Sequence, residues 1–390
     1  MTKQETKYRL SPNVTKDDTV AREISDYAEN KFVAKNKYLG SLPLSDENYV
    51  TTWERYLRES EKEGVFKTLQ SYLIQFRFPI QKNISQLNNY RDATLRGMAT
   101  DKMASASGLW LSDPNSLELF IYQSVAGKIP VLIVPNCEDF SHIVRALSHR
   151  NEPVHIPKSM GAAMIKGINN WGRILELKTN WMATNLSGSW SKEFIKNILP
   201  TKSLYQDKII VLSHKPYSGV TSESLGIPYK KWIEHSLKIR LEHECTHFFT
   251  LRYYGHMANN MHDELIADYM GISKVLGKFN ANWFLKFIGL ENYPNYTSGA
   301  RLENYLGKPS ISKIGFEMLK TIVKNAAYNM AEFDESLGLH QDELDRTLRL
   351  MSLCSVNLLD IASGHGVKKL IAEYKRNKIA NPMYNPKYEE

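Results

Sequence analysis

Two histidines and a glutamate lie within five positions of one another in this 390-residue chain, as His243, Glu244 and His247. Successive residues of an α-helix turn by about 100°, so two histidines four positions apart lie about 40° apart on one face. Both imidazoles can then bind one metal ion, and Glu244 can reach a water molecule beside that ion. The pattern therefore indicates zinc-assisted hydrolysis, in which the carboxylate accepts a proton from a water made more acidic by the metal.

A catalytic zinc ion needs a third protein ligand, and the sequence offers one after the histidines. The segment NNMHDELIADYMG (259–271) carries Glu264 and Asp268, again four positions apart on one helical face. The intervening residues leave room for a first helix to end at Gly255 and a second helix to follow. Glu264 would bind the metal. Asp268 would accept a hydrogen bond from the free ring nitrogen of a ligating histidine.

An H-E-x-x-H motif followed by E-x-x-x-D resembles the gluzincin, or thermolysin-like, zinc metallopeptidases. The resemblance is carried by residues 243–268 and by the order of a strand before the motif and helices after it. It implies that zinc is bound by His243, His247 and Glu264. Glu244 would be the general base, and Asp268 would accept a hydrogen bond from a ligating histidine.

The resemblance also implies an α+β, zincin-like fold. A mixed α/β amino-terminal half would contain a small sheet, the active-site helix would follow, and the carboxyl-terminal region would be helical. The segments PYSGV (216–220), HECTHFFTLR (243–252) and DELIADYMG (263–271) together are also similar to an uncharacterised bacterial zincin-like group.

Other zinc classes fit the spacing less well. The metzincin extension requires glycine and histidine at the positions that Thr250 and Tyr253 occupy here. His256 and His262 are further histidines near the motif, but neither has a partner at ligand spacing. The sequence therefore favours a glutamate as the third ligand.

Residues that could contact a substrate or its oxyanion are less clearly marked. Tyr253, His262 and Arg240 are near the motif and carry donors. Arg240 could instead form an ion pair with Glu244 or with neighbours of Glu264. A substrate backbone could pair with an edge strand near the motif helix, formed by residues 155–173 or by residues 209–217.

The elements that position these residues follow from periodicity and breakers. Helices are expected over 18–36, 46–76, 137–150 and from about Pro228 to Tyr254, and strands at 129–135, 154–159, 173–179 and 207–217. Beyond the motif helix the expected helices are 262–277, 281–289, 311–333, 340–361 and 365–377.

We expect a boundary near residue 110. It would separate a mostly helical region, 1–110, from a zincin-like domain, 111–390. Within that domain we expect an α/β part at 111–227, the motif helices at 228–277 and a helical part at 278–390.

Composition limits the class of protein. Apolar residues make up 42% and charged residues 24%, as in globular chains, and the net charge of +8 is spread along the sequence. We find no nucleic-acid-binding module, no secretory signal, and no apolar run long enough to span a membrane. Three widely spaced cysteines do not form a simple disulfide framework. We therefore expect a cytoplasmic protein that binds neither nucleic acid nor membranes.

Two functions remain open from the sequence. The first is a zinc metallopeptidase acting on a peptide or protein. The second is a non-enzymatic protein in which zinc, or the vestige of a zinc site, stabilises two helices. The second predicts a closed site with a fourth protein ligand such as His256 or His262, and it gives no role to Glu244.

Overall fold

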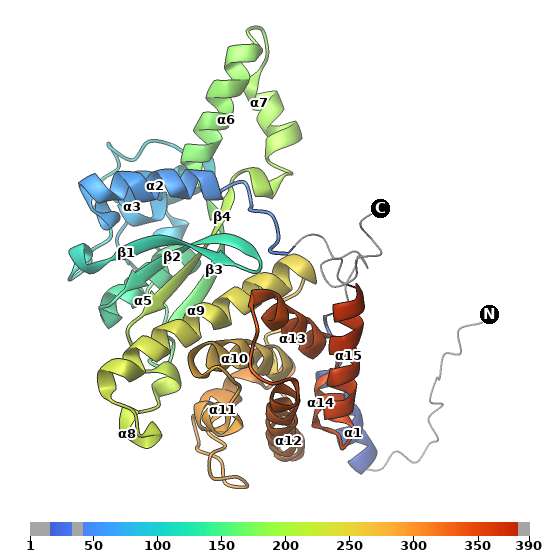
Figure 1. The fold of residues 1–390 in the computed structure, drawn as a ribbon. Coiled ribbons are helices and arrows are strands. Elements are labelled where there is room, and N and C mark those ends of the chain that lie inside the picture. Colours follow the sequence, from blue (N-terminus) through green and yellow to red (C-terminus); the bar gives the residue numbers. More distant parts are fainter. Residues whose placement is uncertain (1–15, 33–41, 381–390) are drawn as a thin grey trace. The chain divides into compact units, whose positions relative to one another are not determined.

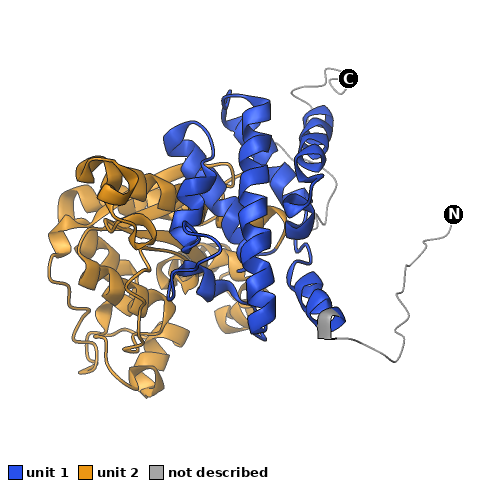
Figure 2. Ribbon diagram, turned by 90° about the horizontal axis from the view of Figure 1, so that it is seen from below, with its two compact units in different colours: residues 1–35, 256–390 blue, residues 36–255 orange. Residues whose placement is uncertain are grey.

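The computed structural model describes residues 16–32 and 42–380 (Figure 1). The chain forms two compact units (Figure 2). Residues 36–255 make the first, which we call the sheet unit. Residues 1–35 and 256–390 make the second, which we call the helical unit.

The sheet unit is built on four strands, β1 (Glu118–Ser124), β2 (Gly127–Val134), β3 (Ala162–Asn169) and β4 (Gln206–Ser213). Their order is β1-β2-β4-β3. The β2–β4 pair is parallel, and the β1–β2 and β3–β4 pairs are antiparallel. The expected mixed α+β architecture with a small sheet is confirmed. The order places β1 and β3 at the two edges.

Helices of the sheet unit precede, interrupt and follow the strands. They are α2 (Val50–Glu63), α3 (Val65–Tyr72), α4 (Asn88–Arg96), α5 (Cys137–Ser148), α6 (Trp171–Thr184), α7 (Trp190–Glu193), α8 (Ser222–Leu225) and α9 (Tyr229–Tyr253). The expected helix from about Pro228 to Tyr254 is therefore α9.

One hydrophobic core joins the early helices to the sheet. Trp53 of α2 and Phe140 of α5 pack in it with Leu132, Ile165 and Val211 from three strands. Residues before and after position 110 share this core, and the chain divides into its two compact units at residue 255. The boundary expected near residue 110 stays a prediction. Helix α9 contacts β3 and β4 but contributes nothing to this core, so it lies on the other face of the sheet.

Two expected strands are absent. Residues 173–179 lie in helix α6, which begins where the Asn170 side chain accepts a hydrogen bond from the Arg173 amide. Ile174 and Leu177 then face one small core, at helical spacing. Residues 154–159 are irregular, because a proline at 157 has no amide hydrogen for a ladder. The strand begins later, at Ala162.

The described part of the helical unit contains helices and no strand. They are α1 (Lys16–Tyr27), α10 (Met261–Leu276), α11 (Ala281–Ile288), α12 (Lys313–Leu337), α13 (Glu343–Ser355), α14 (Leu358–Ala362) and α15 (Gly366–Ala380). The helical carboxyl-terminal region is thus confirmed. The end of the expected 18–36 helix, residues 33–36, lies outside the described residues.

The helix expected over 340–361 is divided in two. Helix α13 ends at Ser355, and the Asn357 side chain caps the start of α14 by accepting a hydrogen bond from the Asp360 amide. None of the described helices combines the length and the apolar character needed to cross a lipid bilayer.

A buried charge network holds the helical unit together. Arg349 of α13, only 1% exposed, lies 2.9 Å from Asp334 and 3.0 Å from Asp345. Asp334 also accepts hydrogen bonds from Tyr269 and His340. Burial raises the pKa of Asp334, but these hydrogen bonds outweigh it, so the pKa lies below its usual value. Arg349 thus forms ion pairs with both buried carboxylates.

Replacing Arg349 by methionine is expected to destabilise the helical unit by about 3–5 kcal/mol, because two buried carboxylates lose their cation. Urea denaturation followed by circular dichroism measures this. The control is Arg376→Met on α15, where the exposed pair with Glu373 contributes about 1 kcal/mol at most. Equal effects of the two changes would show that the network does not stabilise the unit.

Candidate metal centre

Helix α9 carries the H-E-x-x-H motif in its carboxyl-terminal half. It is 25 residues long and ends just before Gly255, whose φ of +76° suits glycine. His243 and His247 are 7% and 4% exposed, whereas Glu244 is half-buried. The helix therefore buries the two imidazoles and leaves the carboxylate between them partly accessible.

The two histidine rings converge as the spacing predicts. The Nε2 atoms of His243 and His247 lie 3.0 Å apart. The hydroxyl of Tyr217, from the turn after β4, lies 3.1 Å from Nδ1 of His243. A hydrogen bond at Nδ1 fixes the ring orientation and leaves Nε2 to face the second histidine. Both Nε2 atoms are therefore directed toward one point.

Glu244 is held by a strand. The amide of Met164, in edge strand β3, donates a hydrogen bond of 2.9 Å to Oε2 of Glu244. Residues 155–173 were one of two segments expected to supply an edge strand beside the motif. The structure identifies β3, within that segment, as the edge strand, while β4 lies inside the sheet. The carboxylate therefore lies at the outer edge of β3.

Glu264 and Asp268 are buried on helix α10 of the helical unit. The helix begins where the Asn260 side chain accepts a hydrogen bond from the Asp263 amide. Arg301 donates to both carboxylates, at 3.3 Å to Glu264 and 2.6 Å to Asp268. Arg301 thus compensates two buried negative charges. The expected bond from a ligating histidine to Asp268 stays a prediction.

Tyr305 is a further partner of Glu264. Burial, together with the nearby Glu264 carboxylate, raises the pKa of the Tyr305 hydroxyl well above its usual value. The hydroxyl therefore stays protonated and donates its hydrogen bond to Glu264. One oxygen-ligand candidate is thus oriented by two neighbours, Arg301 and Tyr305.

Three of the residues singled out by the sequence form a buried group that could bind a metal ion. His243, His247 and Glu264 each offer a ligand atom, and these atoms lie within 4.8 Å of one another. Two imidazole nitrogens and one carboxylate oxygen are ligands that zinc accepts. Within the described residues, no other histidine, cysteine, aspartate or glutamate belongs to the group.

Arg240 contacts backbone carbonyl groups and an aromatic ring. Its guanidinium donates to the carbonyl oxygens of Ser213, Lys215 and Pro216, and it lies 5.5 Å from the centre of the Tyr217 ring. These bonds hold the segment that leads from β4 to Tyr217. Arg240 therefore positions the tyrosine that contacts His243, and its expected contact with substrate stays untested.

The other two expected substrate contacts also pack against protein groups. Tyr253 stacks on Phe249 with ring centres 5.2 Å apart. Nε2 of His262 lies 3.1 Å from the carbonyl oxygen of Leu353, and burial lowers the pKa of this histidine to about 4. His262 is thus a neutral residue inside the helical unit, and its one ring N–H is donated to Leu353 and not to an oxyanion.

Met164, Tyr217, Arg301 and Tyr305 are neighbours of the motif residues that the motif itself does not reveal. Met164 acts through its backbone amide, so its side-chain type carries no signal. Arg301 and Tyr305 follow Glu264 by more than 35 positions, in a short helical turn (Arg301–Tyr305). Tyr217 precedes His243 by 26 positions, and the spacing of the motif does not mark it.

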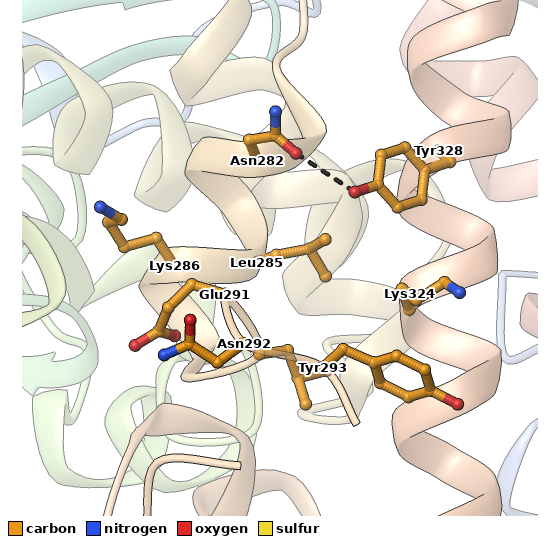
Figure 3. Close-up of a pocket in the computed structure, with 9 residues that line it drawn as sticks. Asn282, Leu285, Lys286, Glu291, Asn292, Tyr293, Lys324 and Tyr328 are labelled. Carbon is orange, nitrogen blue, oxygen red and sulfur yellow. Dashed lines mark hydrogen bonds between the residues drawn. The ribbon is translucent and has the colours of Figure 1, made fainter. Parts of the chain in front are cut away.

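A separate cavity lies in the helical unit, between α11, α12 and the loop after α11 (Figure 3). Its volume is about 450 Å³. Tyr328 and Asn282 are hydrogen-bonded at 3.2 Å on one side, and Lys324 lies 4.5 Å from the centre of the Tyr293 ring on another. No residue of the metal-binding group lines this cavity, so it is not the reaction site that the motif indicates.

In comparisons with known proteins, the chain matches a family whose description names no activity. Residues 11–365 match a family described as a family of unknown function. No curated protein and no solved structure matches the chain.

Proposed function

The chain belongs to the family of unknown function DUF7005, and we propose that it is a zinc-dependent hydrolase that cleaves peptide bonds. The observation that carries the proposal is the buried group of His243, His247 and Glu264. Glu244 within the same motif is the expected general base. A zincin-like fold of the gluzincin kind is part of this proposal.

The donor set fits zinc. The two Nε2 atoms are 3.0 Å apart, close to the separation of two nitrogens that each lie about 2.0–2.1 Å from one tetrahedral ion. Tyr217 can accept the hydrogen of Nδ1 of His243, and in that tautomer Nε2 is free to bind a metal. Glu264 adds an anionic oxygen, which gives the two-histidine, one-glutamate set known from catalytic zinc sites.

Zinc bound there would act as a Lewis acid toward the substrate carbonyl and would make water more acidic. The Glu244 carboxylate would accept the proton of the attacking water and deliver it to the departing amine. The Met164 amide holds this carboxylate in place. Because Glu244 is half-buried rather than enclosed, solvent and substrate can reach it.

The outer edge of β3 suits a peptide substrate. An edge strand presents backbone donors and acceptors to which an extended peptide can pair. The edge that carries the Met164 amide also carries Glu244, so a paired peptide would pass beside the carboxylate. This arrangement favours a peptide over a small carboxylic ester.

The alternative is a non-enzymatic, zinc-stabilised protein. A structural zinc site takes four protein ligands and needs no base beside it. The described part of the chain supplies three ligands to the group, and His262, once a candidate for the fourth, is bonded to Leu353. These observations favour the enzyme. A cytoplasmic location also stays a prediction, and the three cysteines are free thiols.

A cleavage assay tests the proposal. The purified protein is incubated with a peptide library made by digesting a proteome, and new peptide ends are identified by mass spectrometry. We expect cleavage that stops on adding a zinc chelator and returns on adding zinc. Cleavage that persists in the chelator would contradict the zinc-dependent mechanism. Stoichiometric zinc without any cleavage would favour the structural alternative.

A further inference from the structure

A groove of about 690 Å³ runs along the outer edge of β3 in the sheet unit. One wall is the strand from Met164 to Asn169. The opposite wall comes from residues 85–95, which include α4, and from residues 146–150 at the end of α5. The groove begins at Met164, whose amide binds Glu244, and so it leads away from the proposed base.

Three cations line this groove: Arg91, Arg150 and Lys166. All three side chains are exposed, and no aspartate or glutamate is among the lining residues. None of the three has an ion-pair partner in the part of the chain that the structure describes. Lys128 and Lys208, on neighbouring strands, are by contrast paired with Glu54 and Glu47. We call this groove, with its three cations, the basic groove.

The strand wall offers backbone groups as well as charge. In an antiparallel pair, both polar groups of one residue point to the same side, and the side alternates along the strand. The Gly161 carbonyl accepts from Ser213 of β4, whereas the Met164 amide points outward to Glu244. The same alternation turns the backbone of Lys166 outward, away from β4. The alternation is interrupted by a register shift between Lys166 and Ile168, so the outward backbone of Lys166 is the point of β3 at which an extended chain can pair in the basic groove.

From this juxtaposition we infer that the basic groove selects substrate segments rich in aspartate and glutamate. This rests on the proposed function, because the groove continues from Glu244. A segment paired with β3 would place its carboxylates beside Arg91, Arg150 and Lys166, which form no ion pair with the described residues. Substrates with lysine or arginine at the same positions would be repelled.

An acidic polypeptide fits better than a nucleic acid of the same charge. The outer edge of β3 carries backbone donors and acceptors that match a peptide strand. Single-stranded nucleic acids are bound by a positively charged groove together with exposed aromatic rings on which bases stack. The one aromatic residue that lines the groove, Tyr90, is buried and bonded to Asn151.

The test measures binding and cleavage separately. Binding uses the Glu244→Gln protein and two fluorescein-labelled peptides of equal length, alternating Glu-Val and alternating Lys-Val, followed by anisotropy. A single-stranded RNA of matching charge is the third probe. The groove variant carries Arg91→Glu, Arg150→Glu and Lys166→Glu. The control carries the same charge change at Arg58, Lys62 and Lys230, which are exposed residues outside the groove.

We expect the Glu-Val peptide to bind at least tenfold more tightly than the Lys-Val peptide. The groove variant should bind it about a hundredfold more weakly, and the control should bind it nearly unchanged. Binding should weaken as ionic strength rises. In the peptide-library assay, sequences cleaved by the wild-type protein should be enriched in aspartate and glutamate on one side of the cut.

The failures of the two proposals can be told apart. Cleavage without acidic enrichment, or equal binding of the two peptides, overturns the inference and leaves the hydrolase intact. Selective binding of the acidic peptide, lost in the groove variant but with no cleavage by wild type, supports the groove and contradicts the hydrolase. Tighter binding of the RNA than of the acidic peptide also overturns the inference.

Discussion

Replacing Glu244 by glutamine lowers kcat by roughly 10²–10⁴-fold, the usual contribution of a general base, and leaves zinc bound. The amide has nearly the same shape as the carboxylate, so the side chain keeps its place beside β3. It cannot accept the proton of the attacking water. Turnover of a peptide found in the library assay measures the loss, and elemental analysis measures the metal in the same sample.

Glu234→Gln is the matched control for this change. Glu234 is on the same helix, is exposed, and precedes the metal-binding group by more than two turns. The control should keep wild-type kcat. A Glu244→Gln protein that turns over substrate at the control's rate would show that another group takes the proton.

Replacing His247 by alanine abolishes turnover and weakens zinc binding. The loss of affinity should exceed the roughly 10–100-fold that removal of an outer hydrogen-bond partner costs, because a direct ligand is lost. Competition with a coloured zinc chelator measures the affinity. Circular dichroism checks that the helices remain, since α9 keeps its buried Phe248 and Phe249 contacts.

His149→Ala controls for the removal of a histidine. His149 is exposed at the end of α5 and is not part of the metal-binding group. Zinc affinity and turnover should be unchanged in this control. If the His247→Ala protein binds zinc as tightly as the control, then the metal is bound elsewhere and the assignment of ligands is wrong.

The sequence predicted the local parts of the site well. The i, i+4 spacing of His243 and His247 placed both rings on one helical face, and the structure brings their Nε2 atoms to 3.0 Å. The expected end of α9 at Gly255 and a second helix bearing Glu264 also agree with the structure. These features depend on helix periodicity and capping, which are written in neighbouring residues.

The sequence did not predict what surrounds those residues. Met164 is 80 positions before Glu244, and the bond between them depends on strand order, which no local pattern specifies. The expected strand at 173–179 was wrong because the Asn170 cap and the helical spacing of Ile174 and Leu177 outweigh a short apolar run. The boundary expected near 110 stays a prediction, and core packing joins segments on both sides of it that are distant in sequence.

The metal content of the wild-type protein tests the central claim most directly. The protein is purified without metal-chelating resin, dialysed against metal-free buffer, and analysed for transition metals by inductively coupled plasma mass spectrometry. We predict about one zinc per chain, as three ligands of a catalytic site imply. A protein that contains no stoichiometric transition metal, and takes up none when zinc is added, would contradict the assignment of His243, His247 and Glu264.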